Sequence, residues 1–349
     1  MRVSLNPVET LCAYCETSLN CYSTSQLISI IIVLSDKRTY ICDGNLLSTC
    51  VMTELKIPKV VKTNKEGYEF ISNLYPIIVN DSQNEVLIDF TQCNSFDGNL
   101  AAALGAILDK VVNEGKQIFL NRPKIKTVRR VLSRNHFLRA WAVRTDVEDK
   151  ENYVEYKRFA SNGKSEEFKQ YIDNGLVRKI RFPKHTSKVG ESIIESIFEI
   201  YVNAITHGET DYVYSCGEYK EDDNTLEMTI VDCGKTIPGN VNNYFSSKGK
   251  TNIDSCAAIE WAFISGNTTK LQTGGLGLAI LKDFIKLNDG AIQVVSGSGM
   301  IEFTGSKTDR FLLCTDFPGT IVNMKFNFDD PKTYLMKSER GHINMNDLL

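Results

Sequence analysis

The stretch from 198 to 208, FEIYVNAITHG, constrains the fold of this chain more than any other part of its sequence. Glu199, Asn203 and His207 recur at every fourth position, and residues four apart lie above one another on one face of an α-helix. Apolar residues fall roughly opposite: Ile193, Ile194, Ile197, Tyr201 and Ile205. The pattern predicts a helix that packs its apolar side on a core and presents a carboxylate, an amide and an imidazole to a metal ion, a water or a phosphate. The alternative is a helix face hydrogen-bonded to a neighbouring loop.

The bulk properties of the chain set broad limits. A length of 349 residues favours two or three domains. The net charge of −3 gives no reason to expect a nucleic acid or a membrane surface as partner. The longest apolar run, residues 27–34, is too short to cross a bilayer, which takes about 20 residues. We therefore expect a cytoplasmic protein.

Cysteines are concentrated near the N-terminus, where half of the ten lie in the first fifty residues. Cys12 and Cys15 form one C-x-x-C pair, but Cys42 and Cys50 are too far apart to supply the second close pair of a zinc site. Buried thiols are the simpler interpretation, with zinc as the alternative. We expect residues 1–51 to be an N-terminal extension of unknown fold.

Residues 52–145 alternate between strand-like and helix-like patterns. Short apolar runs predict strands, and apolar residues at helical spacing predict helices, the second opened by Pro123. In chain order the strand, helix, strand and helix are expected at 85–90, 99–115, 116–120 and 122–137. This order with short links predicts a small α/β layer structure.

The stretch from 85 to 137 resembles a STAS domain, the fold of anti-sigma-factor antagonists. Those domains place a strand, a D-S-x-G-like turn and a helix in this order, then a strand and a V-x-x-V-L helix. Many carry a phosphorylatable Ser or Thr directly after the Asp of the turn. Here Gly98 and Asn99 follow Asp97, and Ser95 lies two residues before it. The resemblance implies a STAS-like domain that lacks the phospho-switch and serves as a docking or dimerisation surface.

Two further segments are charged and poor in apolar residues. We expect residues 146–175 to be a connector with one strand or a helical turn. We expect residues 329–349 to be a polar tail.

The second half of the chain contains three more patterned stretches. An alternating strand at 225–232 ends in Asp232, whose carboxylate can accept a hydrogen bond from an exocyclic amine, and Gly234 would let a flat ring approach the backbone. A glycine-rich loop at 273–277 leads into an apolar helix, and a helix N-terminus of this kind offers N–H groups to phosphates. Strands close the unit between 291 and 327.

These stretches in this order, from 176 to 328, resemble the Bergerat-fold ATPases of the GHKL superfamily. FEIYVNAITHG is most similar to the N-box of the anti-sigma-factor serine kinases, and GGLGLAILKDF to the second glycine box of sensor histidine kinases. The resemblance implies a two-layer α/β sandwich that binds ATP and Mg²⁺.

The resemblance also implies roles for individual residues. Asn203 would coordinate Mg²⁺, and Glu199 would act as general base or hold the ion shell. Asp232 would bind the adenine amine, with Gly234 under the ring. His207 would lie near the sugar and phosphates of the nucleotide.

The phosphate end of the expected site lies further along the chain. Gly275 and Gly277 would line the phosphate loop. The stretch 240–272 would form a lid over the triphosphate, from which Lys270 would meet the γ-phosphate. Thr236 departs from the family pattern, because a second glycine usually stands there, and its side chain would narrow the adenine pocket.

Two functions remain open at this point. One is an enzyme that hydrolyses ATP or transfers its γ-phosphate to a Ser or Thr of a partner protein. The other is a non-catalytic module in which ATP switches the docking of a regulatory partner on the STAS-like half. A homodimer is compatible with either, and neither the partner nor the trigger is named by the sequence.

Overall fold

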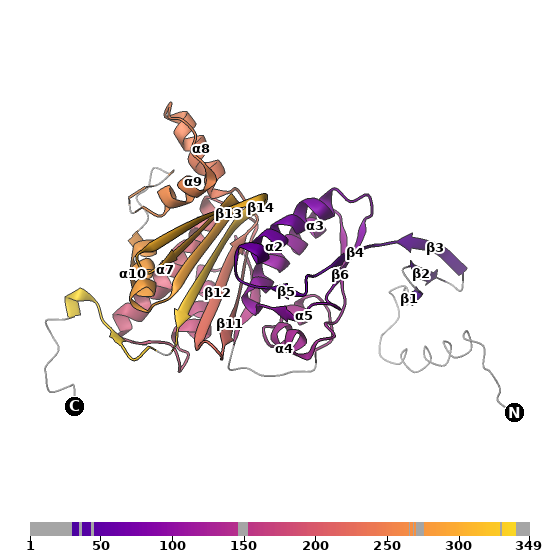
Figure 1. Ribbon diagram of the computed structural model, residues 1–349, viewed down its shortest axis with the longest axis horizontal. Helices are drawn as coiled ribbons and strands as arrows, with labels where there is room; N and C mark the ends of the chain where they lie inside the picture. The colour runs from indigo at the N-terminus through magenta and orange to yellow at the C-terminus, as the bar shows by residue number, and fades with distance from the viewer. Residues whose placement is uncertain are drawn as a thin grey trace. The chain divides into compact units, whose positions relative to one another are not determined.

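Figure 1 shows the computed structural model of the chain. It describes residues 30–34, 37–42, 45–145, 153–264, 266–267, 269, 276–328 and 330–339. The chain divides into two compact units, Met1–Met52 and Thr53–Leu349.

The first unit contains a three-stranded antiparallel sheet. Its strands are β1 (Ile30–Leu34), β2 (Lys37–Cys42) and β3 (Asn45–Val51), paired in sequence order. The C-x-x-C pair on which the zinc alternative depends, Cys12 and Cys15, lies outside the described residues.

The second unit begins with a small parallel sheet that carries two long helices. The expected strand–helix–strand order between residues 85 and 120 is confirmed. The final helix, α4, begins at Lys126 and not at Pro123, because residues before it stay extended and Ile125 is the N-cap. The strands are β4 (Thr53–Lys56), β6 (Glu85–Asp89) and β8 (Gln117–Leu120), and the helices are α2 (Lys65–Val79), α3 (Ala101–Asn113), α4 (Lys126–Arg134) and α5 (Phe137–Ala140).

A five-stranded antiparallel sheet forms the centre of the second unit, in the order β13-β14-β12-β11-β9. Its edge strand β9 (Tyr153–Ala160) and the following helix α6 (Ser165–Ile172) come from the stretch expected to be a connector. Residues 153–172 are therefore part of the folded core and not a linker. The other strands are β11 (Tyr212–Lys220), β12 (Thr225–Asp232), β13 (Ala291–Thr304) and β14 (Lys307–Asn327).

Helices cover one face of this sheet. The helix predicted from the opening motif is α7 (Ser187–Thr206), and Ile193, Ile197 and Tyr201 are buried in the core that it shares with the sheet. Helix α10 (Leu276–Leu287) packs beside α7 on the same face. The predicted orientation of α7, apolar side toward the core, is confirmed.

The other face of the sheet is covered by α2 and α3 from the beginning of the unit (Figure 1). Leu104 of α3 and Ile88 of the small sheet belong to the same core as Val231 of β12. Because helices lie on both faces, all eight residues of β12 are buried. The mixed α/β class is confirmed, and the expected boundary near residue 145 does not divide the structure into separate bodies.

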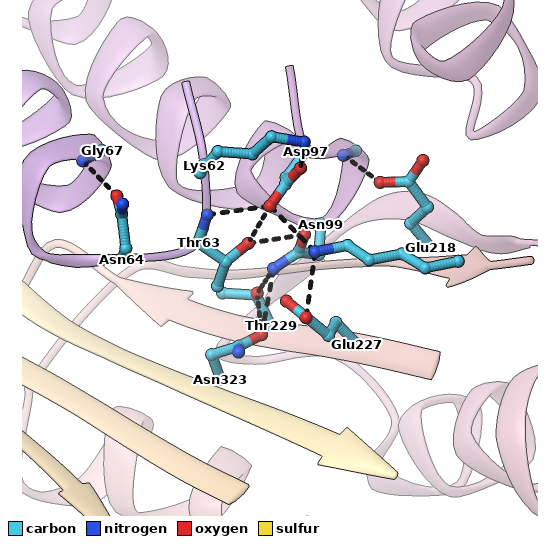
Figure 2. A network of polar contacts seen from close by, with 12 residues as sticks. Lys62, Thr63, Asn64, Gly67, Asp97, Asn99, Glu218, Glu227, Thr229 and Asn323 are labelled. Atoms are coloured by element: carbon cyan, nitrogen blue, oxygen red, sulfur yellow. Dashed lines mark hydrogen bonds and ion pairs between the residues drawn. The ribbon is translucent and has the colours of Figure 1, made fainter. Parts of the chain in front are cut away.

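A network of polar contacts joins the turn at 97–99 to strands β11, β12 and β14 of the five-stranded sheet (Figure 2). We call this network the polar joint. Asp97 accepts hydrogen bonds from the Thr63 backbone N–H at 2.8 Å and from Lys220 Nζ at 2.8 Å. Lys220 also contacts Glu227 Oε1 at 2.9 Å. Despite its burial, Asp97 has a pKa below the ordinary value, because Lys220 and the other donors stabilise the carboxylate.

Three further hydrogen bonds complete the polar joint. The backbone N–H of Gly98 donates to Glu218 Oε2 at 2.5 Å. The fully buried Asn99 side chain donates to Thr229 Oγ1 at 3.1 Å and to Asn323 Oδ1 at 3.0 Å. The joint therefore consists of residues 97–99, Lys62 and Thr63 on one side and Glu218, Lys220, Glu227, Thr229 and Asn323 on the other (Figure 2).

The start of the expected polar tail is also folded. Strand β15 (Thr333–Tyr334) pairs in parallel with β10 (Lys184–His185), just before α7. The ring of Tyr334 packs on Phe284 of α10 at 4.7 Å between centroids. Residues 340–349 lie outside the described part of the chain.

A search of the described helices for one with the length and apolar character needed to cross a bilayer finds none.

Candidate functional site

Helix α7 brings the polar residues of the opening motif to one pocket. Thr186 is the N-cap and accepts a hydrogen bond from the Val189 N–H, and the helix ends at Thr206 with His207 as C-cap. Glu199, Asn203 and His207 all line the pocket. The prediction that they share one face is confirmed, and that face is turned to a cavity.

The pocket lies between α7, the end of β12 and two shorter helices, α8 (Ile237–Ser247) and α9 (Ser255–Ala262). It encloses about 1000 Å³ not occupied by atoms, part of it open to solvent. Apolar side chains from the sheet form part of the wall: Ile230 and Val322.

Asp232 supplies a buried carboxylate to the pocket from the last position of β12. The residue is 4% exposed, and its Oδ1 accepts a hydrogen bond from the Gly234 N–H at 3.0 Å. Burial raises the pKa of Asp232 to about 7. Among the described residues no Lys, Arg or His forms an ion pair with it. The carboxyl group therefore retains acceptor capacity for a donor on a ligand.

Gly234 is required by a contact between two backbone segments. A Cβ at this position would lie 2.1 Å from the carbonyl oxygen of Gly208, and the next residue, Lys235, donates its N–H to that same oxygen at 2.6 Å. The glycine thus lets the end of β12 lie directly against the end of α7, and this contact sets the position of Asp232 next to the helix. The expected place of Gly234 under a ring stays a prediction.

Thr236, which replaces the second glycine of the family pattern, forms part of a helix cap. Its hydroxyl accepts a hydrogen bond from the Gly239 N–H at 3.1 Å and so caps α8. Its φ of −73° suits any residue. The side chain is not among those that line this pocket, and the expected narrowing of an adenine site stays a prediction.

His207 connects the end of α7 to the segments that follow β12. Its Nδ1 lies 3.1 Å from Thr269 Oγ1, and its carbonyl oxygen accepts a hydrogen bond from Asn240 Nδ2 at 2.7 Å. Both Thr269 and Asn240 also line the pocket. The imidazole therefore lies in the wall of the pocket, at the junction of α7 with α8.

The stretch expected to form a lid contains helices. Between residues 240 and 272 lie most of α8 and all of α9, which pack on each other through Phe245 and Trp261 with ring centroids 5.5 Å apart. Lys270 and Gly275 fall outside the described residues, and their expected phosphate contacts stay predictions. Gly277 is the second residue of α10 and so lies in the first turn of a helix.

The oxygen donors of α7 fit a hard cation. Asn203 makes no side-chain hydrogen bond within the described part of the chain, and Glu199 lies one turn before it in the same pocket. Over that same part there is no group of three or more His, Cys, Asp or Glu side chains able to hold a metal by themselves. Mg²⁺ is commonly held by one or two protein oxygens together with substrate phosphates, so this donor set suits magnesium bound with a nucleotide.

Several pocket residues were not predicted from the sequence. They come from the loop after β12, from the start of α8, from the end of α9 and from β14: Lys235, Ile237, Trp261, Phe263 and Thr320. Thr320 and Val322 are two apart on one strand and hence on one face. That spacing was readable in the sequence, but it does not tell which face of the sheet holds the pocket.

No family model matches the chain, and no curated protein matches it.

Proposed function

We propose that the protein binds an adenine nucleotide with Mg²⁺ in the pocket of α7 and β12, and that it hydrolyses the nucleotide or transfers its γ-phosphate to a Ser or Thr of a partner protein. The observation that carries the proposal is the convergence of Asn203, Glu199 and Asp232 on one pocket. These side chains come from two elements, α7 and β12, whose ends are brought together by the Gly208–Gly234 contact.

The two kinds of side chain that line the pocket suit the two parts of a nucleotide. Asp232 is a buried acceptor without a cationic partner among the described residues, which suits an exocyclic amine better than a phosphate. Asn203 and Glu199 offer oxygen atoms to the Mg²⁺ that would accompany the phosphates. In this assignment the base binds near the end of β12 and the phosphates bind along α7.

Glu199 favours the enzyme over the alternative of a nucleotide-sensing module without turnover. In the enzyme its carboxylate accepts the proton of the attacking water or hydroxyl, a role worth about two to four orders of magnitude in rate. A sensing module has no use for a general base. The alternative draws support from β12, which borders the pocket on one face and the polar joint on the other.

The test uses the full chain and two variants. Asn203→Ala removes an ion ligand, so affinity for Mg-ATP measured by calorimetry should fall. Glu199→Gln keeps the size of the side chain, so affinity should stay within a few fold while phosphate release or phosphoryl transfer falls by about two to four orders of magnitude. Glu191→Gln is the matched control, because Glu191 is exposed on the same helix two turns earlier.

Each outcome has a separate meaning. If the unmodified protein binds neither ATP nor an ATP analogue, the proposal is wrong. If it binds ATP and Glu199→Gln changes neither affinity nor turnover, the sensing module is correct. If both variants lose binding to the same extent, Glu199 belongs to the ion site and is not the base.

A further inference from the structure

Positive charge is concentrated in one short segment of this protein. Residues 122–144 contain eight Lys and Arg residues and no Asp or Glu. The whole chain carries a net charge of −3, so the remainder carries −11. Such segregation is unusual for a solvated face, where both signs are normally mixed. We call residues 122–144 the basic segment.

The basic segment is a rigid part of the fold. Helix α4 packs Val128 and Leu132 into the core of the second unit. Asn135, directly after the helix, donates from Nδ2 to the Gly98 carbonyl oxygen at 3.0 Å, and this contact ties the segment to the polar joint. A surface held in this way loses little conformational entropy when a partner binds.

Two cations of α4, Lys126 and Arg130, face solvent. Lys126 and Arg130 are exposed and one turn apart, so they repel each other. Within the described residues neither takes part in an ion pair, and the same holds for the exposed cations on either side: Lys124, Arg139 and Arg144. The fold carries a local electrostatic cost here that a negatively charged partner would remove.

We infer that the basic segment is a docking surface for an acidic segment of a partner protein. Three of the five exposed cations named above are Arg, whose planar guanidinium pairs with carboxylates through two parallel hydrogen bonds. Ile125, 37% exposed between Lys124 and Lys126, adds an apolar contact of the kind that protein partners use. The inference concerns a surface outside the nucleotide pocket and does not depend on nucleotide binding.

A short acidic peptide fits this surface better than a nucleic acid does. Helix α4 has nine residues and is therefore about 14 Å long. A longer polyanion would extend beyond it over a protein that carries −11 elsewhere. A peptide with a few carboxylates contacts only the basic segment and avoids that repulsion.

The test measures binding of a labelled decaglutamate peptide to the full-length protein by fluorescence anisotropy. We expect binding that weakens as salt is raised, because the contacts are exposed and screened. The double variant Lys126→Glu with Arg130→Glu should lower affinity at least about tenfold. The matched control is Lys164→Glu with Lys184→Glu, which changes the net charge equally at two exposed sites outside the segment and should leave affinity within about twofold.

Parallel measurements separate this inference from its competitors. Thermal melting of both double variants establishes that they are folded. If the control loses as much affinity as the Lys126/Arg130 variant, net charge and not this surface governs binding, and the inference fails. It also fails if the peptide does not bind, or if a ten-nucleotide DNA strand or phosphatidylserine vesicles bind the same surface more tightly than the peptide. Loss of ATP binding leaves this inference standing, because the peptide assay contains no nucleotide.

Discussion

Replacing Glu218 by Gln should stabilise the protein at pH 8 and have little effect at pH 5. Glu218 lies in the polar joint, where burial, assisted by the negative charge of Asp97, raises its pKa from the ordinary 4.5 to about 7. The folded protein therefore holds a proton that the unfolded chain has already released. Glutamine mimics the neutral acid, because its amide oxygen can still accept the hydrogen bond from the Gly98 N–H.

The size of the effect follows from the change in proton affinity. Each pKa unit is a tenfold change in proton affinity and corresponds to about 1.4 kcal/mol. The rise from 4.5 to about 7 thus amounts to roughly 3 kcal/mol above pH 7 and less than about 1 kcal/mol at pH 5. Glu218 keeps partial contact with solvent, which screens its charge. We therefore expect a gain of about 2 kcal/mol at pH 8.

The direction of the pH dependence is fixed by which state binds the proton. Because the folded state holds it more tightly, the contribution of Glu218 to stability is complete below pH 4.5 and declines as pH rises toward 7. Asp97 acts in the opposite direction. Its lowered pKa means that its contribution is lost in acid, below its ordinary value of 3.8. The two windows do not overlap, so the effect of Glu218 can be isolated above pH 5.

The assay is urea unfolding followed by circular dichroism at pH 5, 6, 7 and 8. Glu218→Gln should raise the free energy of unfolding progressively across this series, while the exposed Glu191→Gln should not change it. An equal effect of Glu218→Gln at pH 5 and pH 8 would refute the reasoning. A loss of stability at pH 8 would also refute it, since it would mean that the ionised carboxylate is the favoured form in the joint.

Two further predictions concern the pocket and the turn. Asp232→Asn should preserve or raise stability at pH 8, because burial raises the pKa of Asp232 to about 7 and the carboxylate that is ionised at pH 8 is therefore destabilised, whereas the amide is neutral. The same change should lower affinity for ATP at least about tenfold; calorimetry beside urea unfolding measures both, and unchanged affinity would exclude the base-binding role. Gly98→Ser should destabilise by about 2 kcal/mol or more, because its Cβ would lie 2.6 Å from Val131 Cγ1. In the unmodified protein, phosphopeptide mapping after incubation with ATP should find no phosphate between residues 85 and 110, and stoichiometric phosphate on Ser95 would contradict this.

Local periodicity predicted the elements of the fold well. The helix of Glu199 and Asn203, the strand ending in Asp232 and the helix of residues 99–115 all form as expected. Each has a strong apolar pattern that one element can satisfy by itself. Prediction was weaker where a boundary depends on the backbone, as at Pro123, which precedes α4 instead of opening it.

Long-range packing was not predictable from these patterns. Residues 153–160 are rich in charged side chains and belong to the stretch expected to be a connector with one strand or a helical turn. A strand does form there, but it is β9, the edge of the central sheet, where alternate side chains can face solvent. The cover of α2 and α3 over the second face of the sheet was also not foreseen. The sequence of β12, TLEMTIVD, reads as a strand with one polar face, so it does not reveal that both faces are buried.

The pocket could be predicted only in part, because its assembly also depends on contacts between distant parts of the chain. Spacing on α7 places Glu199, Asn203 and His207 on one face, but the approach of Asp232 depends on the contact of Gly208 with Gly234, two residues 26 positions apart. Nothing in the local pattern of either glycine shows that they meet.

The doubly covered strand β12 has a consequence for how this protein can evolve. Its odd-numbered residues Thr229 and Val231 contact the first half of the unit, and the even-numbered Ile230 between them lines the pocket on the other face. A gene that encoded the second half alone would leave the buried Asn323 and Thr229 on an exposed sheet face beside apolar residues. The two halves are therefore expected to be inherited as one reading frame, and duplication or loss should act on both together.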